Sequence, residues 1–134
     1  MNDVTIVGNL TADPVYRVSD RNQRGVVRFD VAVNRQRFDR DSNQYIDLPP
    51  VYHRVVAFGP LADNVNKSLQ RGVEVVVVGS FADDSYEKDG EKRRQQVLEA
   101  QVIAPSLRFA TAEVKKTQRI TATQRESKEI YDGE

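Results

Sequence analysis

The sequence contains no cysteine, no tryptophan and a single histidine, His53. Without cysteine the chain can form neither a disulfide nor a thiolate metal site. A zinc site usually needs several His or Cys ligands, and this sequence has one His and no Cys. We therefore predict no metal, no cofactor and no catalytic residue, since no activated nucleophile or carboxylate pair stands out either. A structural or subunit-interface role is expected for His53.

Long apolar runs are also missing, so no membrane span is expected. The start of the chain, Met1–Thr5, lacks the basic and apolar stretches of a signal peptide, which predicts a cytoplasmic location. At 134 residues, with 39% apolar and 30% charged residues, the chain is long enough for one globular domain and a tail.

Net charge is absent too, because 20 Lys and Arg balance 20 Asp and Glu. A zero total does not exclude a nucleic-acid partner, because binding needs local basic surface. The stretch 17–40 is basic, because it contains only three aspartates but seven arginines: Arg17, Arg21, Arg24, Arg28, Arg35, Arg37 and Arg40. A second basic cluster, Lys92–Arg94, follows an Asp89-Gly90 pair that is typical of a hairpin turn. Taken alone, such clusters are more often solvated surface.

Period-two alternation predicts five strands. They are Val4–Leu10, Gly25–Asn34, Val51–Phe58, Val73–Phe81 and Gln95–Ala104. Gly8 in the first strand indicates a bulge or a close backbone approach, and the valine run 75–78 predicts a strand buried on both faces. Between the first two strands, Thr11–Pro14 reads as a turn.

A short helix is expected to begin at Pro60, with Leu61, Val65 and Leu69 on one face and Gly72 in the left-handed conformation at its end. The polar segment Arg35–Pro50 is predicted to be a long loop or a hairpin arm.

The order of three strands, a helix and two strands predicts an all-β OB-fold, a five-stranded Greek-key barrel with one short helix between strands 3 and 4. We place this domain at residues 1–109, with Phe29, Phe81 and Phe109 in its core. Residues 110–134 are polar, which predicts a mobile tail.

Aromatic and basic residues recur together in the predicted strands and arms. Alternation puts Tyr52, Arg54 and Phe58 on one face of the third strand, although Phe58 could equally belong to the core. Flat rings beside cations suit a single nucleic-acid strand, since rings stack on bases and cations meet phosphates. The predicted binding residues are Arg35, Arg37, Phe38, Arg40, Tyr52, Arg54, Phe58, Arg71, Tyr86, Lys88, Lys92, Arg93 and Arg94.

Several motifs together resemble the bacterial single-stranded DNA-binding protein family. They are Val4–Leu10, Asp13-Pro14 with Arg17, Tyr52–Ala62, Arg71-Gly72 and Val78-Gly79. The resemblance covers about residues 1–109. It implies an OB-fold homotetramer that wraps single-stranded DNA without sequence preference in replication, recombination and repair, and that is associated with the nucleoid.

The resemblance also assigns positions. Tyr52 stands where the family usually has Trp, Phe38 at a loop position often held by Trp, and Tyr86 where a hairpin aromatic is expected. Phe58 matches the family's Phe-Gly pair, Arg54 and Arg71 match basic positions, and His53 matches a subunit-interface histidine.

The sequence also departs from the family pattern. Pro60 replaces a frequent Lys, and Asp83-Asp84 lie where Arg or Lys is common, so local phosphate attraction should be weaker. The family's linker and acidic tip are not matched by Ile130–Glu134, which argues against recruitment of repair and replication enzymes through such a tip. An accessory paralogue or a phage-encoded member is left open.

Two alternatives within OB-fold binding modules stay open. An RNA-binding or replication-restart protein would share fold and charge, and a protein-interaction domain would use the same Tyr and Arg side chains as binding hot spots. Competition between DNA and RNA oligomers distinguishes the RNA-binding alternative from DNA binding. Alanine variants at Tyr52 and Phe38 test the protein-interaction alternative, which predicts that they abolish a protein contact and leave DNA binding intact.

Overall fold

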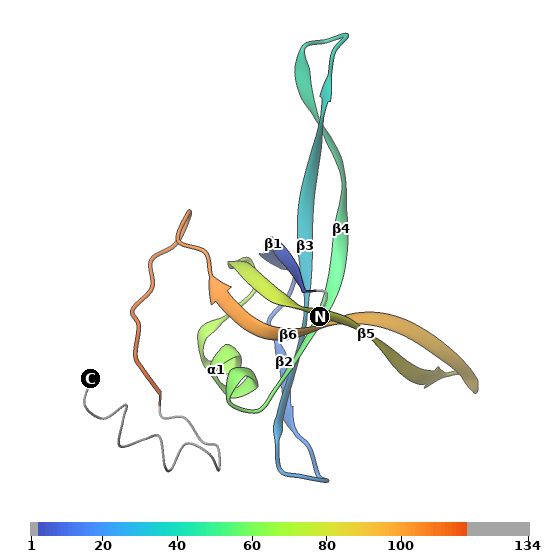
Figure 1. The fold of residues 1–134 in the computed structure, drawn as a ribbon, viewed down its shortest axis with the longest axis vertical. Helices are drawn as coiled ribbons and strands as arrows, with labels where there is room; N and C mark the ends of the chain where they lie inside the picture. Colours follow the sequence, from blue (N-terminus) through green and yellow to red (C-terminus); the bar gives the residue numbers. More distant parts are fainter. Residues whose placement is uncertain (1–2, 118–134) are drawn as a thin grey trace.

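Six strands and one helix make up the computed structural model, which describes residues 3–117 (Figure 1). The strands are β1 (Val4–Leu10), β2 (Val15–Val18), β3 (Gly25–Asp39), β4 (Gln44–Phe58), β5 (Glu74–Lys88) and β6 (Glu91–Pro105). The helix, α1 (Pro60–Ser68), lies between β4 and β5. Within the described part of the chain, no helix is long and apolar enough to cross a membrane.

Five of these strands close into a barrel. Neighbours pair in the order β1-β5-β6-β4-β3, and β3 returns to β1 through Asn9–Ala32 and Leu10–Val31. All strand pairs are antiparallel except β4–β6, which is parallel at Val55–Leu98. The predicted OB-fold is therefore confirmed. The short β2, which pairs with Gly25–Arg28 of β3, was not predicted because four residues carry too little alternation to mark a strand.

The core fills the barrel with one residue in two from each strand. Its largest fully buried side chains are Val27, Val31, Val55, Val75, Val77 and Leu98. Phe29 is buried as predicted. The expectation that Val75–Val78 is buried on both faces is wrong, because Val76 and Val78 point to the outer face and are only partly covered.

Two further core predictions are wrong. Phe81 is 40% exposed because it lies where β5 begins to leave the barrel. Phe109 is 82% exposed because it follows the end of β6, and the guanidinium of Arg108 lies 5.4 Å from its ring centre.

Both long strand pairs continue beyond the barrel as hairpin arms, which point in different directions (Figure 1). The first arm, residues 35–48, is a paired ladder of β3 and β4 closed by a turn at Arg40–Asn43. The hairpin alternative for Arg35–Pro50 is thus the correct one. The second arm, residues 83–94, ends in the two-residue turn Asp89-Gly90, whose φ angles of 56° and 80° confirm the predicted hairpin tip.

Close approach between β1 and β3 depends on Gly8. A Cβ at this position would collide with the Ala32 carbonyl oxygen, and it would lie 2.7 Å from a methyl group of Val31. The predicted close backbone approach is confirmed, and it lies beside the β1–β3 pairing that closes the barrel.

The predicted helix is confirmed, with Ala62, Val65 and Leu69 buried against the barrel. The helix ends at Ser68, with Leu69 as its extended C-cap. Gly72 has the predicted positive φ, 89°, but it belongs to the turn before β5 and not to the helix end.

After β6, residues 106–117 contain neither helix nor strand. Arg108 ties this segment to β5 through two hydrogen bonds to Glu74, at 2.9 and 2.6 Å. These bonds, with one from Ser106, hold the pKa of Glu74 at about 2, well below its ordinary value of 4.5. The prediction of a mobile tail at 110–134 falls mostly on residues 118–134, outside the described residues.

Candidate nucleic-acid interface

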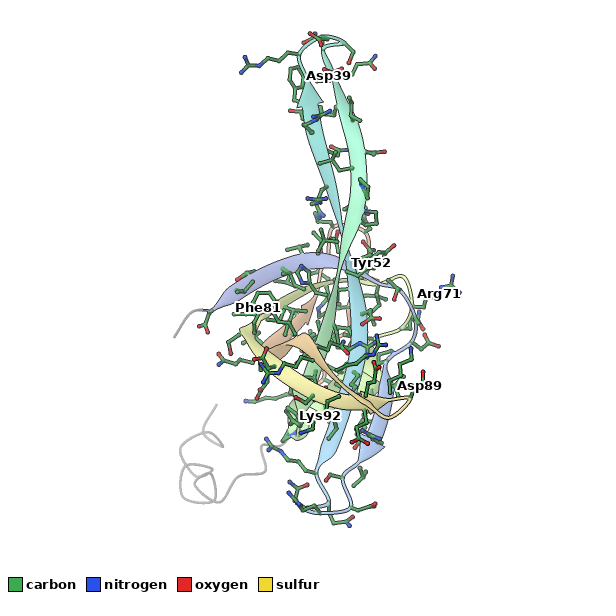
Figure 2. All side chains as sticks on the ribbon, turned by 90° about the vertical axis from the view of Figure 1, so that its right-hand side faces the viewer. Asp39, Tyr52, Arg71, Phe81, Asp89 and Lys92 are labelled. Carbon is green, nitrogen blue, oxygen red and sulfur yellow. The ribbon has the colours of Figure 1, made fainter. Side chains whose placement is uncertain are left out.

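The outer face of the β3–β4 ladder carries the central predicted residues. Cross-strand register pairs Ala32 with Tyr52, Asp30 with Arg54 and Val26 with Phe58, so all six side chains share one face. Tyr52 is 63% exposed and stands at the base of the first arm (Figure 2). Its ring is open to a stacking partner.

Phe58 lies at the other end of this face and is half-buried. The guanidinium of Arg24 lies 5.5 Å from the centre of its ring, within cation–π range. Phe58 is therefore neither a fully buried core residue nor an open platform, and a base stacking on it would share the ring with Arg24.

Arg54 has a carboxylate partner that the sequence did not reveal. Its Nε donates to Asp30 Oδ1 at 2.6 Å and its Nη2 to Asp30 Oδ2 at 3.3 Å, with both side chains 38% exposed. The two residues face each other across strands and are 24 positions apart in the chain. Sequence periodicity could place Arg54 on the face, but it could not pair it.

A pocket of about 280 Å³ adjoins this ion pair. Its lining comes from the turn after β1 and from β2, β3 and β4, namely Thr11, Ala12, Asp13, Val15, Arg28, Phe29, Asp30 and Arg54. The Arg28 guanidinium also lies 4.0 Å from the Asp84 carboxylate of the second arm. The pocket is thus lined by two guanidinium groups, Arg28 and Arg54, and by two carboxylates, Asp13 and Asp30.

The first arm presents a pair of rings. Phe38 and Tyr45 are cross-strand neighbours, with ring centres 5.2 Å apart in an edge-to-face arrangement. Tyr45 is 69% exposed and was not among the predicted site residues. The only sequence signal for it was an aromatic residue in an otherwise polar segment.

Arg35 and Arg37 of this arm do not share the face of Phe38. Arg35 and Arg37 pair with Leu48 and Ile46 and therefore point to the opposite face. The Arg35 guanidinium donates to the Pro49 carbonyl at 3.3 Å, and Arg40 is an exposed residue of the turn. Alternation therefore separates Arg35 and Arg37 from the face of Phe38.

The second arm carries the other basic cluster. Lys88, Lys92, Arg93 and Arg94 are all exposed, and Arg93 lies 3.7 Å from Glu91. The backbone of Tyr86 pairs with that of Arg93, and Asp84 with Gln95. Cations therefore concentrate on β6 of the arm, while Asp83 and Asp84 lie on β5.

Arg71 stands apart from both arms. It is exposed, its side chain points away from the barrel (Figure 2), and its backbone N–H donates to Asp13 at 2.8 Å. That bond places Arg71 beside the turn that lines the pocket.

His53 lies on the opposite face of β4 from Tyr52 and is half-buried. Its ring centre is 6.0 Å from that of Phe81 on β5. Within residues 3–117 no group of three or more His, Cys, Asp or Glu side chains could hold a metal ion. The subunit-interface role of His53 stays a prediction.

A closed five-stranded barrel with rings and cations on its outer face, extended by two long arms, defines the class of OB-fold binding proteins. The model of the single-strand binding protein family matches residues 1–110, and the chain belongs to this family.

Its relatives include the single-stranded DNA-binding proteins of Paenarthrobacter aurescens, 41% identical over 87% of this chain and 68% of theirs, and of Mycobacterium leprae, 42% identical over 87% and 69%. Among solved structures, the small single-stranded DNA-binding protein of Streptomyces coelicolor aligns with a TM-score of 0.65 and 29% identity. That alignment covers 79% of this chain and 94% of the other. Family membership confirms the expectation of a binding protein rather than an enzyme.

Proposed function

We propose that this protein binds and protects single-stranded DNA without base preference, in replication, recombination and repair. The observation that carries the proposal is the set of open rings on the β3–β4 ladder, Tyr52 at the base of the arm and the Phe38–Tyr45 pair near its tip. Membership of the single-strand binding protein family supports it.

Stacking on these rings is expected to supply the binding that does not depend on salt. A stacked base contributes about 1–3 kcal/mol and is tolerated whatever its identity, because every base has a π-face. Tyr52 and Phe38 are the proposed main platforms, with Phe58 and Tyr86 as further stacking positions.

Phosphate contacts are expected to supply the salt-dependent part. We assign them to Arg35, Arg37, Arg40, Arg54, Arg71, Lys88, Lys92, Arg93 and Arg94. Each neutralised phosphate should add about 0.7 to the slope of log affinity against log salt for a single strand.

A homotetramer is proposed as the working assembly. The outer face of β1, β5 and β6 carries an apolar patch of Val7, Val76, Val78 and Val102, two of them exposed and two partly covered. β1 pairs along its length with β5, whereas its pairing with β3 spans only Asn9 and Leu10. An apolar face beside an open strand edge favours association with a second copy. A second proposed interface site is formed by His53 and Phe81. Sedimentation equilibrium measures how many copies of the chain assemble.

The proposed location is the cytoplasm, in association with the nucleoid, as follows from a DNA ligand. The residues on which an acidic recruitment tip would depend, 130–134, lie outside the described residues.

The test is a titration of fluorescent oligo-dT followed by anisotropy at several salt concentrations, with duplex DNA and oligo-rU of equal length as competitors. Binding that resists the duplex and weakens linearly with log salt supports the proposal. Absence of binding at low salt overturns it, and preference for oligo-rU points to RNA instead.

A further inference from the structure

A carboxylate lies in the middle of the proposed binding face. Asp30 accepts two hydrogen bonds from Arg54, Nε to Oδ1 at 2.6 Å and Nη2 to Oδ2 at 3.3 Å. A guanidinium offers the same two-pronged geometry to a phosphate group. Asp30 therefore occupies the position on Arg54 that a DNA phosphate would take.

A second carboxylate repeats the arrangement at greater distance. Asp84, on the second arm, lies 4.0 Å from Arg28, which also lines the 280 Å³ pocket with Asp30 and Arg54. The pocket is much larger than the roughly 30 Å³ that one water occupies in the liquid, so a phosphate and accompanying water can enter. Both guanidinium groups of the pocket thus already lie next to an acid of the same chain.

We propose that this pocket is a phosphate subsite for the bound strand and that Asp30 is a built-in competitor for it. In the free protein Asp30 orients the Arg54 guanidinium; on binding, a phosphate displaces the carboxylate, which turns to solvent. The inference deepens the proposed function and rests on it, since the incoming phosphate belongs to single-stranded DNA.

Displacement lowers affinity for two physical reasons. The Asp30–Arg54 pair, 38% exposed on both sides, must break, and the freed carboxylate then repels the neighbouring phosphate. Competition by Asp30 therefore lowers the affinity for the strand and makes its release easier. In the absence of DNA, the same carboxylate keeps the Arg54 guanidinium oriented.

The decisive variant is Asp30→Asn, which keeps the side-chain shape and removes the charge. Binding of short oligo-dT at moderate salt should tighten about three- to tenfold, because the phosphate no longer competes with an anion. Asp20→Asn, in the exposed turn between β2 and β3, makes the same change in net charge away from the pocket and should leave affinity within about twofold. Asp84→Asn should give a smaller gain than Asp30→Asn, because its pair is longer.

The Arg54→Gln background separates a specific effect from a general one. There the Asp30→Asn substitution should tighten binding much less, because only the repulsion between the carboxylate and the phosphate is then removed. An equal gain with and without Arg54, or an equal gain from Asp20→Asn, would overturn the inference. If wild-type protein does not bind oligo-dT at all, the proposed function fails instead, so the two failures are distinguishable.

The wild-type protein offers a readout that needs no variant. The Arg54 Nε–H, which donates to Asp30 in the free protein, should shift in a ¹H–¹⁵N NMR spectrum when oligo-dT is added. An unmoved resonance at saturating DNA would rule out the exchange of partners.

Discussion

The two hairpin arms are built alike and carry different chemistry. The first arm closes with a four-residue turn and presents a contacting ring pair, Phe38 and Tyr45. The second closes with the two-residue Asp89-Gly90 turn and presents four exposed cations on or near β6. We therefore expect most of the stacking on the first arm, beside the phosphate contacts proposed for Arg35, Arg37 and Arg40, and mainly phosphate attraction on the second arm.

Both arms nevertheless depend on the same barrel, because each is the continuation of two barrel strands. Val55 of β4 and Leu98 of β6 lie side by side where these strands run parallel, and both are fully buried. Side chains that anchor an arm are thus buried at its base, while those that are expected to bind DNA are exposed along it.

The largest expected effect comes from removing an anchor. Leu98→Ala leaves a cavity in the barrel and should lower the free energy of unfolding by about 2–5 kcal/mol, measured by urea denaturation. The control Arg94→Ala, four residues earlier on the exposed arm, should change it by no more than about 0.5 kcal/mol. Equal losses would show that the arm contributes to stability as the barrel does.

Stacking on the first arm should give the next largest effect. Phe38→Ala should weaken oligo-dT binding by about 1–3 kcal/mol and leave the salt slope unchanged, because no charge is removed. Ile46→Ala lies on the opposite face of the same arm, beside Arg37, and is the matched control; it removes no ring and should weaken binding far less than Phe38→Ala does. A weakening from Ile46→Ala alone would place the stacked bases on the face of Arg35 and Arg37 instead.

Removing cations from the second arm should change the salt dependence of DNA binding, which Phe38→Ala leaves unchanged. Replacing Lys92, Arg93 and Arg94 together by Gln should reduce the salt slope by up to about 2, because each phosphate that these cations neutralise adds about 0.7 to the slope. The affinity difference from wild type should shrink as salt rises. A weakening that stays constant from low to high salt would contradict the proposed phosphate contacts of these three cations.

The smallest effect concerns the other end of β5, away from its arm. Because Arg108 holds the pKa of Glu74 at about 2 in the folded protein, against 4.5 ordinarily, this carboxylate stabilises the fold above about pH 4.5. The contribution should fade as pH drops from about 4.5 toward 2, where the folded protein also takes up the proton. Thermal melts of Glu74→Gln should show a smaller decrease in stability over this range than wild type.

Much of the barrel could be predicted because the relevant signals are local. Alternation from Gly25 to Asn34 marks a half-buried strand wherever it is placed, and Asp89-Gly90 favours one turn geometry through its own backbone preferences. The open ring of Tyr52 was likewise predicted, since polar neighbours marked its face.

Other features could not be predicted because they depend on which strands meet. The first arm shows no apolar alternation, since both its faces meet solvent, so its pairing was uncertain. Phe81 looks like a core residue in its own segment, and it is exposed only because β5 leaves the barrel there.

By itself, the sequence determined the type and order of the barrel elements and the second arm's turn. Only the tertiary structure decided which charges and rings face each other: Asp30 against Arg54, Tyr45 against Phe38, and Arg35 and Arg37 turned away from them. The physical reason is that alternation assigns a side chain to a face from its neighbours in the chain, whereas its partner on that face is set by cross-strand register between distant residues.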